Sequence, residues 1–153
     1  MNKIIFPCFC ISILFFSCAS NSTVSSQVDL SIYQYAAISN VMGYNGDTVL
    51  MDMEVKIYDG LLNTRLQMIG DREIDNLSIS QKNSLLLVRF SGTESGGGST
   101  VSINFVDYIT GRPVASCRGE TASLIGESTI NRSIDYAINQ AIKLFPKQEE
   151  NNE

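Results

Sequence analysis

The sequence predicts an α+β two-layer sandwich, in which one mixed, mostly antiparallel sheet of about five strands carries two helices on one face. Two observations indicate this class. Along residues 30–146 the expected order is strand, helix, strand, strand, strand, strand, helix, and such an order favours one sheet covered by helices. The last helix also carries a continuous apolar stripe, which has to be buried against a sheet.

Residues 30–39 are expected to form the first strand, because apolar residues recur at alternate positions while Tyr33 and Tyr35 lie on the other side. A turn at residues 43–46 ends this strand. A helix then begins at an N-cap residue, Asp47 or Thr48, and runs to about Leu62. The buried side of this helix is expected to contain Leu50, Met53, Ile57 and Leu61, with Met51 and Tyr58 adding to it.

The middle of the chain contains two further strands. Residues 65–69 form a short strand, and the highly apolar run 84–90 forms a central strand covered on both faces. Between them, residues 74–79 fit either one helical turn or a short edge strand. The Gly-rich stretch 91–99 lacks the Lys-Ser/Thr ending of a phosphate-binding loop and precedes a strand. It is therefore predicted to be a mobile hairpin loop.

The last three elements are a strand pair and a helix. Residues 100–108 alternate between apolar and polar, and residues 113–118 return as an antiparallel partner after the turn at 109–112. Ser128 is the expected N-cap of the final helix and Pro146 ends it. Its apolar stripe consists of Ile130, Ile134, Ala137, Ile138, Ala141, Ile142 and Phe145.

The N-terminus carries a second signal, independent of the fold. Lys3 is followed by a mostly apolar run, residues 4–16, and then by Ser17-Cys18. This end resembles the lipobox of bacterial lipoproteins, although Phe15-Phe16 departs from the usual Leu and small residue and is similar to the relaxed lipoboxes of Bacteroidetes and spirochaetes. The resemblance implies cleavage before Cys18, acylation of Cys18 with palmitate among its chains, and anchorage to the membrane through this lipid.

The chain accordingly divides into four parts: a lipoprotein signal peptide (1–17), a flexible tether (18–29), a single α+β domain (30–146) and a disordered tail (147–153). No acidic cluster follows Cys18, which favours a position facing the periplasm. We expect the outer membrane, with the inner membrane as the alternative. The alternatives are a periplasmic protein cut elsewhere and an uncleaved anchor. The layout resembles that of small envelope lipoprotein domains, including the N-terminal domain of the TolB type, and this likeness assigns no function by itself.

Composition excludes several classes of function. The formal net charge is −5 and the basic residues are dispersed, so a nucleic-acid partner is not expected. The chain has no histidine, and with Cys8 and Cys10 in the signal peptide and Cys18 acylated, only Cys117 remains as a thiol. We expect Cys117 to be a buried structural residue. No catalytic residue, metal site or cofactor is predicted, and the protein is not expected to be an enzyme.

With histidine absent and one thiol left, acidic residues are the remaining candidates for catalysis. Asp52, Glu54 and Asp59 do not converge on one side of their helix and are expected to form a solvated face. The acids Asp71, Glu73, Asp107 and Glu120 each lie beside a turn, where a solvated carboxylate is expected.

Two functional hypotheses remain. The first is a lipid-anchored interaction or assembly module that binds another, unidentified envelope protein through an exposed sheet edge or the loop 92–99. The alternative is a domain that binds a small ligand or glycan on an aromatic sheet face. That platform would consist of Tyr33, Tyr35, Tyr44 and Tyr108.

Overall fold

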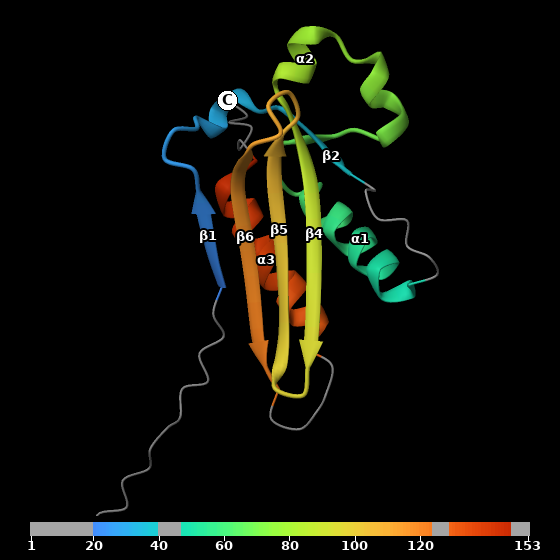
Figure 1. Cartoon of the computed structure of the whole chain (residues 1–153), viewed down its shortest axis with the longest axis vertical. Coiled ribbons are helices and arrows are strands. Elements are labelled where there is room, and N and C mark those ends of the chain that lie inside the picture. Colours follow the sequence, from blue (N-terminus) through green and yellow to red (C-terminus); the bar gives the residue numbers. More distant parts are fainter. Residues whose placement is uncertain (1–19, 40–46, 124–128, 148–153) are drawn as a thin grey trace, which may run out of the picture.

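The structure is a computed structural model that describes residues 20–39, 47–123 and 129–147. Its centre is a six-stranded sheet, on one face of which α1 (Thr48–Leu61) and α3 (Ile130–Leu144) pack (Figure 1). This confirms the predicted α+β sandwich. The strands are β1 (Ser20–Val24), β2 (Tyr35–Ile38), β3 (Gln67–Met68), β4 (Leu85–Ser95), β5 (Gly98–Asp107) and β6 (Pro113–Ala122).

The sheet is mixed, with the spatial order β1-β6-β5-β4-β2-β3. Strands β4, β5, β6 and β1 pair antiparallel, whereas β2 is parallel to both β4 and β3. The unit β2–α1–β3 is thus a parallel crossover. The most apolar segment forms the start of β4, and its Leu85 and Leu86 point to opposite faces and are both buried.

The expected tether differs from the structure, because residues 20–24 of the range 18–29 form the edge strand β1. This strand pairs with β6 from Ser20 opposite Gly119 to Val24 opposite Ala115. Val24 packs against the main core, and Gln140 of α3 donates a hydrogen bond to the Ser20 hydroxyl at 2.8 Å. A Ser-rich, uncharged composition predicted coil, but the free edge of β6 offers backbone partners that local composition does not reveal.

The first predicted strand is also shorter than expected. Leu30–Ile32 form a 3₁₀ turn, capped by the Asp29 carboxylate that accepts a hydrogen bond from the Ser31 N–H, and the strand begins only at Tyr35. The alternation in the sequence extends through these residues, but the 3₁₀ turn leaves Ile32 exposed and buries Tyr33, the reverse of what a strand would do.

The connection that the sequence left undecided is helical. A 3₁₀ segment, Asp71–Asn76, precedes the short helix α2, Ile79–Asn83, and together they lie beyond the upper end of the sheet in Figure 1. Ile74 and Leu77 pack here against a second, smaller core that contains Ala37, Ile69 and Leu85.

The predicted hairpin loop is mostly strand. Pairing between β4 and β5 continues to Ser95 opposite Gly98, which leaves only Gly96 and Gly97 between the strands. Residues 89–93 alternate in exposure as strand residues do, and residues 94 and 95 are exposed. The run of glycines in the sequence therefore marks the turn, while its flanks pair.

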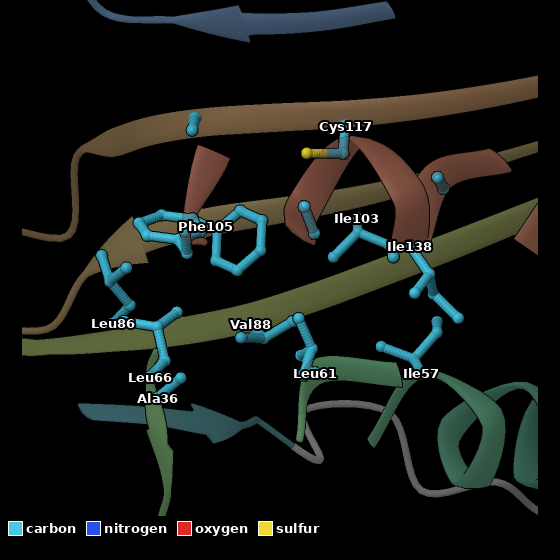
Figure 2. Close-up of a cluster of buried hydrophobic side chains, with 14 of the residues drawn as sticks. Ala36, Ile57, Leu61, Leu66, Leu86, Val88, Ile103, Phe105, Cys117 and Ile138 are labelled. Atoms are coloured by element: carbon cyan, nitrogen blue, oxygen red, sulfur yellow. The ribbon is translucent and has the colours of Figure 1, made fainter. Parts of the chain in front are cut away.

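The main core lies between the sheet and the two long helices. Figure 2 shows side chains from both layers meeting there, with Phe105 of β5 beside Leu86 and Val88 of β4, and Ile57 beside Ile138. The ring of Phe145, at the end of α3, lies 5.0 Å from that of Phe105. Cys117 is fully buried in this core, as predicted, and burial raises the pKa of its thiol to about 12.

One glycine permits the close approach of the sheet and α3, and another permits the close approach of α1 and α3. A Cβ atom on Gly119 of β6 would collide with the backbone oxygen of Ser133 in α3. A Cβ atom on Gly60 of α1 would lie 2.6 Å from the Ile138 side chain. The first contact involves backbone on both sides, so it cannot be relieved by a change of rotamer.

We expect Gly119→Ala to destabilise the domain by about 1–3 kcal/mol, because α3 has to move away from β6 to admit the methyl group. Chemical denaturation followed by circular dichroism measures this change. Gly97→Ala is the matched control, since no atom lies within 4 Å of the added Cβ, and its unfolding midpoint should stay close to that of the wild type. Equal stability of the two variants would contradict the packing described here.

Candidate functional site

The candidate site is the outer side of α1. The helix begins where the Asp47 carboxylate accepts hydrogen bonds from the N–H groups of Val49 and Leu50, as the N-cap prediction required. One side of the helix is buried against the sheet and α3. Its buried residues are Met53, Ile57 and Leu61, all of which were predicted to be in the core.

Apolar side chains also cover the opposite side of α1. Met51, Val55, Tyr58 and Leu62 are 50%, 61%, 41% and 47% exposed, and their spacing of four, three and four residues places them within an arc of about 60°. We call these four residues the α1 stripe. Aligned exposed apolar residues of this size are typical of interaction sites, whereas single exposed ones are ordinary.

The structure corrects two predictions here. Met51 and Tyr58 were expected to add to the buried side of the helix, but they point away from it and belong to the α1 stripe. Their spacing with Val55 and Leu62 was visible in the sequence. Together these residues give α1 a second apolar side, whereas the sequence prediction contains only the first.

A shallow hollow lies along the α1 stripe. Its volume is about 410 Å³, and it is lined by Met51, Glu54, Val55, Tyr58 and Asp59. The lining combines a sulfur-containing side chain, an aromatic ring and two carboxylates. Tyr and Met are enriched where proteins bind one another, because they present a large contact area.

Glu54 has an unusual environment at the edge of this hollow. Its Oε2 atom is buried and has no hydrogen-bond partner among the described residues. Burial raises the pKa of the Glu54 carboxyl above its usual value, and the nearby negative charge of Asp71 adds to this effect. The sequence predicts that Glu54 lies on a solvated face. The structure shows instead that one of its carboxylate oxygens is buried.

Two further hollows are open and polar. One, of about 350 Å³, lies along the β4–β5–β6 end near Gly97 and Thr121. The other, of about 530 Å³, includes Arg65 and Lys147. The Arg65 guanidinium already donates hydrogen bonds to the carbonyl oxygens of Leu30 and Tyr33, so it has a structural role.

The four tyrosines of the ligand hypothesis do not form one platform in the part of the chain that the structure describes. Tyr33 is 3% exposed and belongs to the main core beneath the helices. Tyr35 and Tyr108 lie on the other face, where they pack with Ile74 against the smaller core. Tyr44 lies outside the described residues. Tyr33 caps the 3₁₀ turn that precedes β2, so the strand alternation that would place it on the same face as Tyr35 does not extend to it.

The other predicted interaction features can be placed as well. Cys18, the predicted lipidation site, lies outside the described residues, as does Ser128, and Thr129 occupies the N-cap position of α3. The outer edges of the sheet are β1 and the two-residue strand β3. Within the described ranges, no group of three or more acidic, cysteine or histidine side chains could hold a metal ion.

No helix in those ranges is long and apolar enough to cross a membrane.

Asp107, one of the acids expected to be solvated, is held by the protein instead. It accepts hydrogen bonds from the Tyr33 hydroxyl at 2.9 Å and from both the N–H and the hydroxyl of Thr110. Partial burial alone would raise the pKa of Asp107, but these hydrogen bonds outweigh it and lower the pKa. The interaction joins the segment before β2 to the end of β5.

Comparison of the sequence with protein-family models and with curated proteins finds no match. Solved structures do match. A PDZ domain protein from Parabacteroides distasonis ATCC 8503 is similar with a TM-score of 0.50 and 14% identity, over 83% of this chain and 34% of that one. The PelC dodecamer from Paraburkholderia phytofirmans matches with a TM-score of 0.40 and 14% identity, over 85% of this chain and 100% of that one.

The first of these likenesses shows a shared fold. This chain spans about a third of the length of the PDZ domain protein, so the likeness concerns one part of that larger chain. At 14% identity the likeness shows the fold alone.

Tyr33 provides a test of the buried contact with Asp107. Burial, followed by the hydrogen bond to Asp107 and its charge, raises the pKa of Tyr33 from 10.0 to about 12. Because the folded state holds this proton more tightly than the unfolded state, the stabilisation is complete below pH 10 and is lost as the pH rises towards 12. We expect the wild type to lose up to about 2–3 kcal/mol more than Tyr33→Phe over this interval.

Denaturant titrations at pH 9, 10, 11 and 12 measure the difference. Below pH 10, Tyr33→Phe should be less stable by about 1 kcal/mol, because Asp107 loses a hydrogen-bond donor. If the stabilities of the two proteins fell in parallel between pH 10 and 12, the shifted pKa of Tyr33 would be disproved.

Proposed function

We propose that this chain is a lipid-anchored, non-enzymatic protein of the cell envelope, which acts as an interaction or assembly module on the outer membrane and faces the periplasm. The observation that carries the interaction role is the α1 stripe, where four large apolar side chains are exposed along one helix. Removal of this surface from water by a partner protein would be favourable, at about 25 cal/mol per Å² of apolar area.

The anchor rests on Phe15-Phe16-Ser17-Cys18, which resembles a relaxed lipobox. In this proposal the acylated Cys18 is the new N-terminus and β1 begins two residues later, at Ser20. The edge of the sheet then lies next to the bilayer, without the long flexible spacer that composition suggested. An interaction module in this position meets envelope partners close to the membrane surface.

We expect the wild-type protein to incorporate labelled palmitate and to partition into the detergent phase, since several acyl chains are needed for stable anchorage. Cys18→Ala should abolish both, as measured by metabolic labelling and phase separation in cells. Cys117→Ala is the matched control, because its thiol is buried and far along the chain, and it should label like the wild type. Equal labelling of Cys18→Ala and the wild type would disprove the anchor.

The interaction role is tested by photocrosslinking in intact cells. A photoreactive residue in place of Val55 should give one discrete adduct, because that position is the most exposed of the stripe. The same residue in place of Ile79, which is exposed on α2, should give none. Absence of an adduct at both positions, or equal adducts at both, would exclude the α1 stripe as the interaction surface.

A further inference from the structure

The charges around the α1 stripe allow its partner to be described chemically. Glu54 lies on one flank of the stripe, and Asp59 lies on the other. Asp52 is a further acid on the flank of Asp59, and the charge of Asp71 adds to that of Glu54. An apolar centre with acidic flanks attracts a surface with an apolar centre and basic flanks.

Glu54 also requires a hydrogen-bond donor from the partner. Its buried Oε2 atom lacks a hydrogen-bond partner among the described residues, and a carboxylate oxygen in this state costs free energy until a donor reaches it. It lines the same hollow as Val55 and Tyr58. A lysine or arginine of a partner, seated beside these side chains, would supply the missing donor and form a partly desolvated ion pair.

Charge also argues against two other occupants. A second copy of this chain, docked through the same helix, would bring the acids of one copy towards those of the other. An anionic lipid surface requires cations on the helix. The sole basic residue of α1 is Lys56, and its ammonium group donates to the Asn131 side chain of α3.

We infer that the α1 stripe binds an amphipathic helix of a partner protein, in which apolar residues are flanked by lysine or arginine and one of these cations pairs with Glu54. This inference rests on the proposed interaction role. The stripe extends over twelve residues, from Met51 to Leu62, so its two ends lie about 16 Å apart along the helix. The matching segment therefore needs about three helical turns, and helices that dock in apolar grooves present their anchors along one face in this way.

Two synthetic 18-residue helical peptides test the charge requirement. Both carry the same leucine stripe, flanked by lysine and arginine in one and by glutamate in the other. Binding is measured by fluorescence anisotropy to the full lipidated protein in phosphatidylcholine nanodiscs, with empty nanodiscs as the baseline. We expect the cationic peptide to bind, with an affinity that decreases as salt is added. The anionic peptide should show no measurable binding.

Variants locate the binding. The double variant Val55→Ser/Tyr58→Ser should weaken the binding of the cationic peptide at least about tenfold, which corresponds to about 1.4 kcal/mol of binding free energy. Ile79→Ser/Ile109→Ser removes two exposed apolar side chains away from α1 and should change the affinity less than about twofold. Glu54→Gln should weaken binding about fivefold while thermal stability stays equal or rises, because it removes an unpaired, partly buried charge.

Each alternative has its own outcome. Equal binding of both peptides, or unchanged affinity of Glu54→Gln, would overturn the cationic partner, while a discrete adduct at Val55 in cells would still support the interaction role. Equal weakening by the two double variants would show attraction by net charge and overturn the inference. Self-association in sedimentation experiments that Val55→Ser/Tyr58→Ser abolishes would assign the α1 stripe to a second copy and also overturn it.

Discussion

The close contact between α3 and β6 at Gly119 is the constraint on which the rest of the structure depends. Because no side chain stands between the strand and the Ser133 backbone, α3 lies near enough to the sheet for Ile134, Ala137 and Ala141 to be buried completely or almost completely. The hydroxyl groups of Ser99 and Ser133 then hydrogen-bond to each other at 2.8 Å, and Thr121 bonds to Ser133. A buried polar group in a close-packed layer is tolerated only with such partners.

A second set of contacts connects the segments outside the regular elements. The Arg65 guanidinium donates to the backbone before β2 and lies 5.5 Å from the centre of the Phe145 ring. Tyr33, from the same segment, donates to Asp107 at the end of β5. These interactions hold the irregular start of the domain against the end of α3 and the end of β5. They explain why Tyr33, an attractive ligand contact in the sequence, has a structural role instead.

Helix α1 has two apolar sides with different roles. Met53 and Ile57 join the core, and Gly60 accommodates Ile138 of α3. The outer side exposes Val55 and leaves Glu54 with an unpartnered oxygen, neither of which favours the isolated domain. A protein that keeps features of this kind can do so because they contribute to binding. In the proposed arrangement, the lipid on Cys18 concentrates the protein at a membrane and α1 selects the partner.

The sequence by itself determined the fold class, the central position of residues 84–90, the main apolar stripe of α3 and the burial of Cys117. These features depend on periodicity and on the hydrophobic effect, which act through neighbouring residues. Only the tertiary structure decided that residues 20–24 form a strand, that Tyr33 and Tyr35 face opposite layers, and that Met51 and Tyr58 are exposed. Each of these outcomes depends on what lies across from the residue in space: the free edge of β6, the Asp107 carboxylate, or the absence of a packed layer over α1 among the described residues.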